Sequence, residues 1–286
     1  MNALRKHVVV AIWLVALLAG GPAAGATTDS SVPPPHASVP LYLALGDSLA
    51  AGVGASDPEE TAYVPVFHDY LRQSVGCDRG MTKVCPELGL LNLGVSGATT
   101  TTMLRDQLPV ALQVLGERNG DDDARNDVER ITVDIGGNDA FALYGVCSAG
   151  VTAGCVGAVQ TTFAAVAQNL TTALANLRGV AGADTQIIVM TYYNALIGCD
   201  RSAAAPMADA LLEGGAGLPA GLNDLIRASA AQAGAAVAET YGQLGTEDLV
   251  GGSDCLHPVD SGYRIIADAF AATCEAGRDR SSASGG

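Results

Sequence analysis

Short apolar runs alternate along the chain with longer stretches that carry apolar residues at helical spacing. The short runs predict strands at 41–45, 90–95, 131–135, 187–191 and, more weakly, 235–238. The longer stretches predict helices at 63–75, 99–115, 156–177, 222–233 and 263–274. Strands that alternate with helices form a parallel sheet, and nearly continuous apolar strands fit burial on both faces. The pattern therefore predicts an α/β fold in which a central parallel five-stranded sheet lies between two layers of helices.

The segment 1–26 has the order of a secretory signal peptide. Two basic residues precede an apolar run at 8–19, and small residues at 24–26 provide a signal-peptidase site. The apolar run is too short to span a bilayer. We therefore expect cleavage before Thr27, no stable membrane anchor, and a secreted, extracellular protein.

The rest of the chain divides into three segments. Residues 27–40 contain three consecutive prolines and predict an extended, Pro-rich leader. Residues 41–276 carry the strand and helix pattern, and their length is compatible with a single domain. Residues 277–286 are rich in Ser, Gly and Arg and offer little to bury, so we expect this tail to be disordered.

The composition narrows the classes of partner. Lys and Arg number 15 against 30 Asp and Glu, which gives a formal net charge of −15 at pH 7. Nucleic-acid binding rests on clustered basic residues, so this balance argues against it. Hydrophobic residues make up 49% of the chain and charged residues 16%, which excludes a disordered polyampholyte. We expect a packed globule, monomeric, with no nucleic-acid partner.

Export favours disulfides as the fate of the seven cysteines. Two pairs lie eight residues apart with glycine nearby, which favours the local disulfides Cys77–Cys85 and Cys147–Cys155.

Three cysteines remain after these two pairs. We favour a Cys199–Cys255 disulfide with Cys274 free, although the spacing leaves the other pairings open. Zinc is the competing interpretation, but the chain has no C-x-x-C motif and only three histidines after the signal segment. We therefore expect no metal site and no cofactor.

Polar, glycine-lined turns follow the predicted strands. They are Gly46-Asp47-Ser48-Leu49 after the first strand, Gly94 with Ser96 and Gly97 after the second, Gly136-Gly137-Asn138-Asp139 after the third, and Asp254-Cys255-Leu256-His257 near the C-terminus. In a parallel sheet, ligands bind beyond the carboxyl ends of the strands. These turns are therefore the candidate site.

The turns contain the groups that nucleophilic catalysis needs. A serine hydroxyl is a poor nucleophile unless a base lies next to it. His257 is the best candidate base for Ser48, because His36 lies in the Pro-rich leader and His68 inside a predicted helix. Such a base needs a carboxylate to orient it and to stabilise its cation. Asp254, three residues before His257, can fill that role.

A tetrahedral intermediate also needs preorganised hydrogen-bond donors for its oxyanion. The Ser48 N–H lies where a strand is expected to turn into a helix, which would point it outward. The Gly94 N–H can approach closely because glycine has no side chain. Asn138 can add its side-chain amide.

The four motifs together, in this order, resemble the SGNH or GDSL-type hydrolases, and in particular their secreted bacterial esterase and lipase branch. The resemblance extends from Gly46 to His257. It implies a flavodoxin-like three-layer α/β/α sandwich, an SGNH hydrolase domain over 41–276, and a carboxylic ester hydrolase. It also implies Ser48 as nucleophile, His257 as base and Asp254 as its partner. Ser48, Gly94 and Asn138 would form the oxyanion hole.

Several acidic residues beside these motifs have simpler interpretations. We expect Asp47 to hold the turn through hydrogen bonds and Asp139 to cap the helix that follows it. Asp134, inside a strand pattern, would be a buried carboxylate whose partners the pattern does not identify. The side chain of Cys255 should face away from the triad, which would suit a disulfide that braces this loop.

Two rival interpretations stay open. Residues 94–98 nearly match the G-x-S-x-G nucleophile elbow and make Ser96 a competing nucleophile, although Ala98 replaces the last glycine. An exported binding module with this fold and no chemistry is the other, but it would not need a complete set of catalytic groups.

The substrate is the least determined part. Aromatic residues are few and the single Trp lies in the signal segment, so stacking platforms for a polysaccharide are scarce. Small residues after Asn138 and Asn194 suggest a pocket that admits an acyl chain. We therefore expect a small-molecule or lipid ester with a short to medium acyl chain. A carbohydrate O-acetyl esterase or a lysophospholipase on the same fold is the alternative.

Overall fold

The computed structural model describes residues 39–75, 88–148 and 150–283. The expected signal peptide, nearly all of the Pro-rich leader and the expected Cys77–Cys85 disulfide lie outside the described residues.

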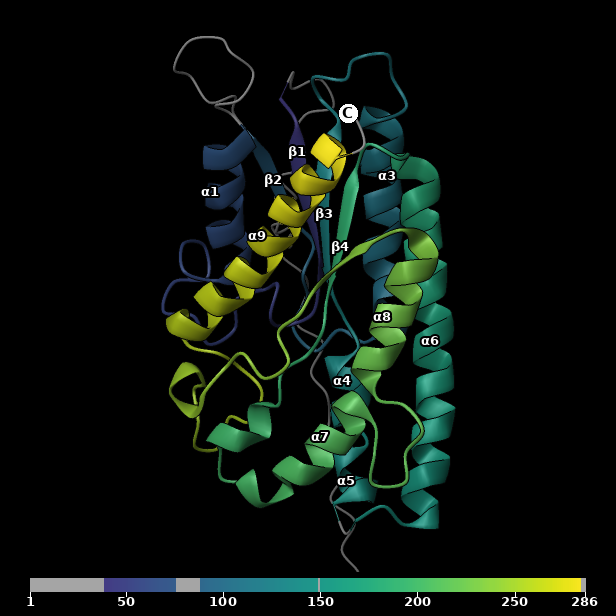
Figure 1. Cartoon of the computed structure of the whole chain (residues 1–286), viewed down its shortest axis with the longest axis vertical. Helices are drawn as coiled ribbons and strands as arrows, with labels where there is room; N and C mark the ends of the chain where they lie inside the picture. The colour runs from purple at the N-terminus through teal and green to yellow at the C-terminus, as the bar shows by residue number, and fades with distance from the viewer. Residues whose placement is uncertain (1–38, 76–87, 149, 284–286) are drawn as a thin grey trace, which may run out of the picture. The chain divides into compact units, whose positions relative to one another are not determined.

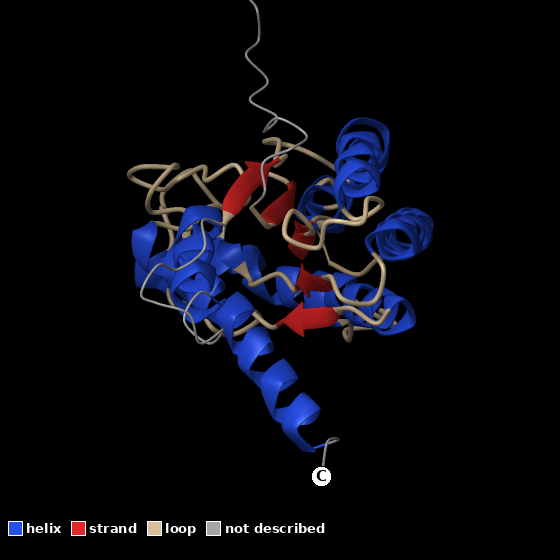
Figure 2. Ribbon diagram, turned by 90° about the horizontal axis from the view of Figure 1, so that it is seen from above, coloured by secondary structure: helices blue, strands red, loops and turns tan. Residues whose placement is uncertain are grey.

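Five parallel strands form the central sheet, as the hydrophobic pattern predicts (Figure 2). Their order is β2-β1-β3-β4-β5, and every pairing is parallel. All six residues of β1, the second strand in this order, are buried, which explains its unbroken apolar run. The strands are β1 (Leu41–Gly46), β2 (Gly89–Asn92), β3 (Val128–Asp134), β4 (Gln186–Met190) and β5 (Ala236–Ala238).

Helices cover both faces of the sheet and give three layers (Figures 1 and 2). Helices α1 (Tyr63–Val75) and α9 (Asp260–Ala283) lie side by side on one face. The rings of Tyr63 and Phe270 stack between them with centroids 5.0 Å apart. On the other face, α6 lies between α3 and α8. Their bounds are α3 (Leu108–Arg118), α6 (Ala153–Ala181) and α8 (Leu222–Ala233).

The helix predicted at 99–115 is divided in the structure. It begins as α2 (Thr100–Thr102), continues as a π-helical turn, η1 (Met103–Gln107), and ends as α3. Pro109 has no N–H and cannot donate to the carbonyl four residues earlier, so a regular α-helical ladder is not available there. In the π turn, the Leu108 N–H donates to the Met103 carbonyl instead.

Two segments differ from the sequence-based expectations. Helix α9 continues to Ala283, through most of the segment 277–286 that was expected to be disordered. Extending an existing helix adds one backbone hydrogen bond per residue without a new nucleation cost. No helix follows β1 directly, because Gly52 and Gly54 adopt positive φ angles of 78° and 96°. A series of turns fills the segment 47–54 instead.

The short helical segments were not predicted. They are α4 (Gly137–Phe141), α5 (Tyr144–Cys147), α7 (Ala205–Glu213) and the 3₁₀ turns η2 (Ala195–Gly198), η3 (Ser202–Ala204) and η4 (Thr246–Asp248). Helices this short bury too few apolar residues at regular spacing to stand out in a hydrophobic pattern.

The strand order determines where a ligand can bind. The chain leaves β1 towards β2 on one side and returns to β3 on the other, so the order reverses between β1 and β3. In doubly wound sheets, the crevice at such a reversal is the usual binding site. The turns after β1 and β3 meet there. Within the described residues, no helix has the length and apolarity needed to cross a membrane.

Candidate active site

Ser48 lies in the turn directly after β1. The turn is anchored at Gly46, whose backbone N–H and carbonyl are both bound by the buried side-chain amide of Gln107 from η1, at 2.9 and 2.8 Å. The carboxylate of Asp47 accepts the Leu49 N–H at 3.0 Å, which is the turn-holding role expected of Asp47. These contacts hold the Ser48 backbone in one orientation.

The structure brings together the three residues expected to form a triad. His257 Nε2 lies 2.9 Å from Ser48 Oγ, and His257 Nδ1 lies 2.8 Å from Asp254 Oδ2. Asp254 Oδ1 also accepts the N–H groups of Leu256 and His257, at 2.9 and 3.0 Å. Burial raises the pKa of Asp254, but the hydrogen bonds from His257 and from these N–H groups outweigh it and hold the pKa below its usual range. The carboxylate is therefore ionised where it faces the imidazole.

A disulfide braces the loop that carries His257. Cys199 and Cys255 are bonded, with both side chains buried, and connect this loop to the segment after β4. The Tyr193 hydroxyl also donates to the Leu256 carbonyl at 2.7 Å. The segment after β4 therefore holds this loop at two points, the Cys255 side chain and the Leu256 carbonyl.

The remaining described cysteines also match the favoured pairing. Cys147 of α5 is bonded to Cys155 of α6, and Cys274 of α9 is free.

The three candidate oxyanion donors differ in what already binds them. Among the described residues, no protein acceptor binds the Ser48 N–H. The Asn138 amide donates one N–H to the Ala98 carbonyl at 2.9 Å and keeps a second N–H. The Gly94 N–H donates to Asn92 Oδ1 at 3.0 Å. Sequence reasoning did not anticipate this last bond, because it depends on the side-chain rotamer of Asn92.

Ser96, the rival nucleophile, is exposed on the loop after β2. His257 hydrogen-bonds Ser48, and no bond joins it to Ser96 among the described contacts. The geometry therefore favours Ser48.

The acidic residues near the site have partners that the sequence did not identify. Asp139 lies inside α4, whose N-cap is Gly136, so it does not cap a helix that follows it. Its carboxylate accepts the Thr100 N–H and hydroxyl, at 2.9 and 3.0 Å, at the start of α2, whose N-cap is Thr99. The partners of Asp134 are the N–H groups of Asp47 and Ala50 and the Tyr63 hydroxyl, which lie in β1's turn and in α1.

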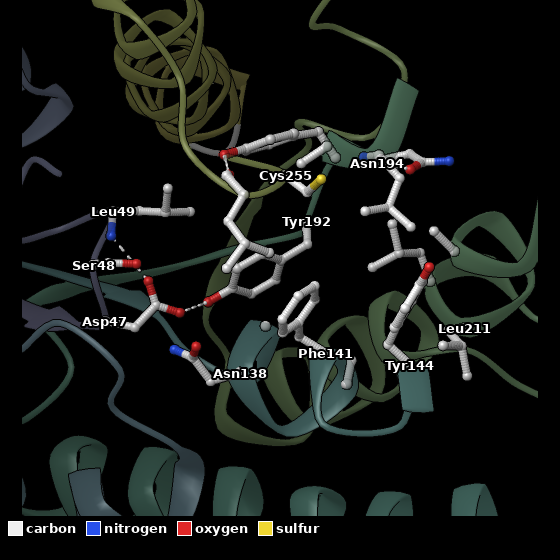
Figure 3. Close-up of a pocket in the computed structure, with 18 of the residues that line it drawn as sticks. Asp47, Ser48, Leu49, Asn138, Phe141, Tyr144, Tyr192, Asn194, Leu211 and Cys255 are labelled. Atoms are coloured by element: carbon white, nitrogen blue, oxygen red, sulfur yellow. Dashed lines mark hydrogen bonds between the residues drawn. The ribbon is translucent and has the colours of Figure 1, made fainter. Parts of the chain in front are cut away.

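An apolar pocket extends from Ser48 towards α7 (Figure 3). Its empty volume is about 740 Å³, part of it open to solvent. Phe141 and Tyr144, with rings stacked 6.1 Å apart, form one wall, and Leu211 of α7 lies at the far end from Ser48. Tyr192 lies between Ser48 and this wall, and its hydroxyl donates to Asp47 Oδ2 at 2.7 Å.

These pocket residues were missed from the sequence, although one signal was present. Ala205-Pro206 precedes apolar residues at Met207, Leu211 and Leu212, and proline in the first turn with such spacing indicates a helix start. The small walls expected after Asn138 and Asn194 do line the pocket, together with aromatic rings that composition alone did not place there. In the part of the chain that the structure describes, no three His, Cys, Asp or Glu side chains gather as metal ligands would.

The flavodoxin-like sheet and the hydrogen-bonded serine, histidine and aspartate at its carboxyl edge define a class, the α/β/α sandwich hydrolases. The family model for GDSL-like lipases and acylhydrolases matches residues 42–270, so the chain belongs to that family. It is a carboxylic ester hydrolase. No curated protein sequence matches the chain.

Solved structures share the fold at low sequence identity. The chain is similar to the lipase Lip_vut3 from a goat rumen metagenome, with 18% identity, a TM-score of 0.53 and coverage of 81% of this chain and 96% of that one. It is also similar to Axe2, an acetylxylan esterase from Geobacillus stearothermophilus, with 16% identity, a TM-score of 0.52 and coverage of 80% and 91%. These likenesses show the three-layer fold.

Proposed function

We propose that the chain is a secreted serine esterase or lipase that hydrolyses carboxylic esters with short to medium acyl chains. The observation that carries this proposal is the hydrogen-bonded series Ser48, His257, Asp254 at the mouth of an apolar pocket. A nucleophile, a base and an orienting acid in this geometry are what acyl transfer through a covalent intermediate requires.

The first half of the reaction forms an acyl-enzyme. Ser48 Oγ attacks the ester carbonyl carbon while His257 Nε2 takes the hydroxyl proton. Asp254 accepts the Nδ1–H bond and stabilises the imidazolium that forms. The intermediate then collapses, the C–O bond to the alcohol breaks, and His257 returns the proton to the leaving alcohol oxygen.

The second half releases the acid. A water molecule gives a proton to His257 as its oxygen attacks the acyl carbon, and the bond to Ser48 Oγ breaks as the proton returns to that oxygen. In both halves the negatively charged oxygen of the tetrahedral intermediate needs hydrogen-bond donors. The Ser48 N–H and the second Asn138 N–H are available, whereas Gly94 must exchange Asn92 Oδ1 for the oxyanion.

The pocket supports an acyl chain as the bound group. Its walls carry Phe141, Tyr144 and Leu211, and burial of each methylene contributes about 0.8 kcal/mol, which is about fourfold in kcat/KM. We expect kcat/KM to rise with chain length until the chain reaches Leu211, and then to fall. The short to medium preference is supported by Leu211, a buried side chain at the end of the pocket away from Ser48.

An ester panel tests the reaction and the acyl preference together. Nitrophenyl esters from acetyl to palmitoyl, an acetylated xylo-oligosaccharide and a lysophospholipid are assayed with wild type, Ser48→Ala and Ser96→Ala. We expect Ser48→Ala to abolish hydrolysis and Ser96→Ala to retain most of it. A kcat/KM that rises all the way to the palmitoyl ester contradicts the acyl preference, and preference for the sugar or the lysolipid favours the alternative substrates.

A serine-directed phosphonate separates an enzyme from a binding module. Labelling of wild type but not of Ser48→Ala is the expected result, and absence of labelling together with absence of ester hydrolysis would revive the binding module.

Export is supported by the two disulfides, which persist in oxidising compartments. N-terminal sequencing of the protein from the culture medium should begin at Thr27.

A further inference from the structure

Two carboxyl groups lie buried side by side beneath Ser48. Asp47 follows β1 and Asp134 ends β3, and the register of the sheet pairs Gly46 with Asp134. Their exposed fractions are 2% and 0%. The Asp47 N–H donates to both the carbonyl and Oδ2 of Asp134, at 3.1 and 3.2 Å, and the two carboxyl groups are within hydrogen-bonding reach of each other.

The backbone beside this pair leaves room for it. A Cβ at Gly46 would lie 2.1 Å from Asp134 Oδ1, far inside van der Waals contact. The first glycine of the Gly-Asp-Ser-Leu motif is therefore required here by the carboxyl group on the neighbouring strand. A side chain at position 46 would displace Asp134 from the turn that carries Ser48.

Each carboxyl group is bound to the nucleophile turn or to the pocket wall. Asp134 Oδ2 also accepts the Ala50 N–H at 3.3 Å, and Asp134 Oδ1 accepts the Tyr63 hydroxyl at 2.5 Å. Asp47 accepts the Leu49 N–H and the Tyr192 hydroxyl. Asp134 thus holds the turn on both sides of Ser48, at residues 47 and 50, without touching the serine.

Among the residues that the structure describes, neither carboxyl group contacts a lysine or an arginine. Two neighbouring carboxylates without a cation cannot both ionise readily in a buried site. Burial raises the pKa of both groups, and for Asp134 the adjacent charge of Asp47 adds to burial and raises the pKa well above its usual range. The titratable groups that face the pair are the phenols of Tyr42, Tyr63, Tyr192, Tyr193 and Tyr263 and the imidazole of His257.

We propose that Asp47 and Asp134 share one proton and that this singly charged pair positions the turn of Ser48 for catalysis. The proposal rests on Ser48 being the nucleophile. Asp134 is then a positioning residue, because it acts on Ser48 only through the backbone of the turn. The shared proton, in place of a nearby cation, keeps the net charge of the two buried carboxyl groups low.

The shared proton also has a consequence for the reaction. When it is lost at alkaline pH, a second negative charge appears beneath the donors that must stabilise an oxyanion. This charge opposes the oxyanion, which exists only in the transition state and the intermediate, so kcat should fall while KM changes little.

Infrared spectroscopy tests the shared proton without reference to activity. A buried protonated carboxyl group gives a carbonyl stretching band that ionised carboxylates lack. In wild type this band should persist at neutral pH and decrease in Asp134→Asn. A band that is absent in wild type at neutral pH, or equally strong in Asp134→Asn, overturns the proposal whatever the enzyme's substrate.

Kinetics against pH test the positioning role. Asn can accept the N–H groups of residues 47 and 50 and cannot ionise, so Asp134→Asn should keep kcat within about threefold of wild type and lose its alkaline decline. Asp134→Leu has similar size but no acceptor, and kcat should fall on the order of 100-fold with KM little changed. Asp248→Asn is the matched control, since that buried carboxyl binds Ser261 and the Gly245 N–H, and it should keep the alkaline decline.

The outcomes separate this proposal from the proposed function. Loss of all hydrolysis in Ser48→Ala with an unchanged alkaline decline in Asp134→Asn would retain the nucleophile and reject the shared proton. A wild-type kcat that stays constant over the alkaline range in which the protein is folded would also reject it. If Asp134→Leu does not fold, Asp134→Asn and the infrared band still decide. If Ser48→Ala remains active, the nucleophile assignment fails while the infrared result on the pair still holds or fails independently.

Discussion

The hydroxyl of Tyr192 donates to the carboxyl group of Asp47 at 2.7 Å, although 145 residues separate them in the chain. The ring of Tyr192 lies against the backbone of Gly137, where a Cβ would be 2.5 Å from the ring. One side chain therefore connects the wall of the pocket, the turn after β3 and the turn that carries Ser48. The wall of the pocket and the turn of Ser48, the proposed nucleophile, therefore share this residue.

Tyr192→Phe should reduce kcat more than it changes KM. The phenyl ring still fills the wall, but Asp47 loses a hydrogen bond in a buried site, which costs about 1–2 kcal/mol of unfolding free energy. Chemical denaturation and steady-state kinetics measure the two effects. Tyr241→Phe, which removes a hydroxyl bound to Asp209 at 2.9 Å, is the control and should leave kcat unchanged. A larger change in KM than in kcat would contradict the connection to Asp47.

Removal of the Cys199–Cys255 disulfide should lower both stability and kcat. The bridge closes 56 residues, which corresponds to about 4 kcal/mol in the chain-entropy account, and it braces the loop of His257. The double alanine variant, compared with wild type by denaturation and by ester hydrolysis, measures this. The Cys147–Cys155 bridge closes only 8 residues, or about 2.5 kcal/mol, and its removal should spare kcat. Equal loss of kcat in the two variants would show that kcat depends on overall stability and not on the bracing of the His257 loop.

The stability of Asp134→Asn relative to wild type should increase with pH. Because burial and Asp47 raise the pKa of Asp134 in the folded state, the folded state binds more protons than the unfolded state above about pH 4. This group's contribution to wild-type stability is therefore full below the unfolded pKa and is lost as pH rises towards the folded pKa. The Asp134→Asn variant has no ionisable group at this position and so does not lose stability in this way.

Denaturant titrations at a series of pH values measure that difference. Asp134→Leu removes the same titration, so its difference from wild type should have the same pH slope, even though its absolute stability differs. A difference that stays constant with pH, or that falls, would mean that Asp134 is ionised throughout.

Leu211→Phe should shorten the preferred acyl chain. Leu211 lies at the end of the pocket away from Ser48, so a larger side chain there blocks the last carbons of a medium-chain ester and leaves an acetyl ester unaffected (Figure 3). Overpacking a buried site costs about 1–3 kcal/mol of stability. Leu225→Phe on α8, outside the pocket lining, is the control. An unchanged chain-length profile in Leu211→Phe would place the acyl group elsewhere.

Much of the architecture was predictable from local pattern. The expected strand at 41–45 is β1 within one residue, and helices α1 and α8 have the expected bounds. The triad candidates could be selected because each follows a strand or lies on a short motif. Two contacts were not predictable in this way. The bond from the Gly94 N–H to Asn92 is local but depends on the Asn92 rotamer, and the bond from Thr100 to Asp139 joins residues 39 apart in the chain.

The sequence by itself determined the fold class and the residues that can carry the chemistry, because hydrophobic period and short motifs are local properties. Only the tertiary structure decided how these residues act together. It placed His257 against Ser48 across 209 residues, closed the pocket with α7, and set Asp134 beside Asp47. These relations depend on strand order and register, which arise from packing of the whole sheet. A buried carboxyl group has no recognisable pattern until the strand next to it is known.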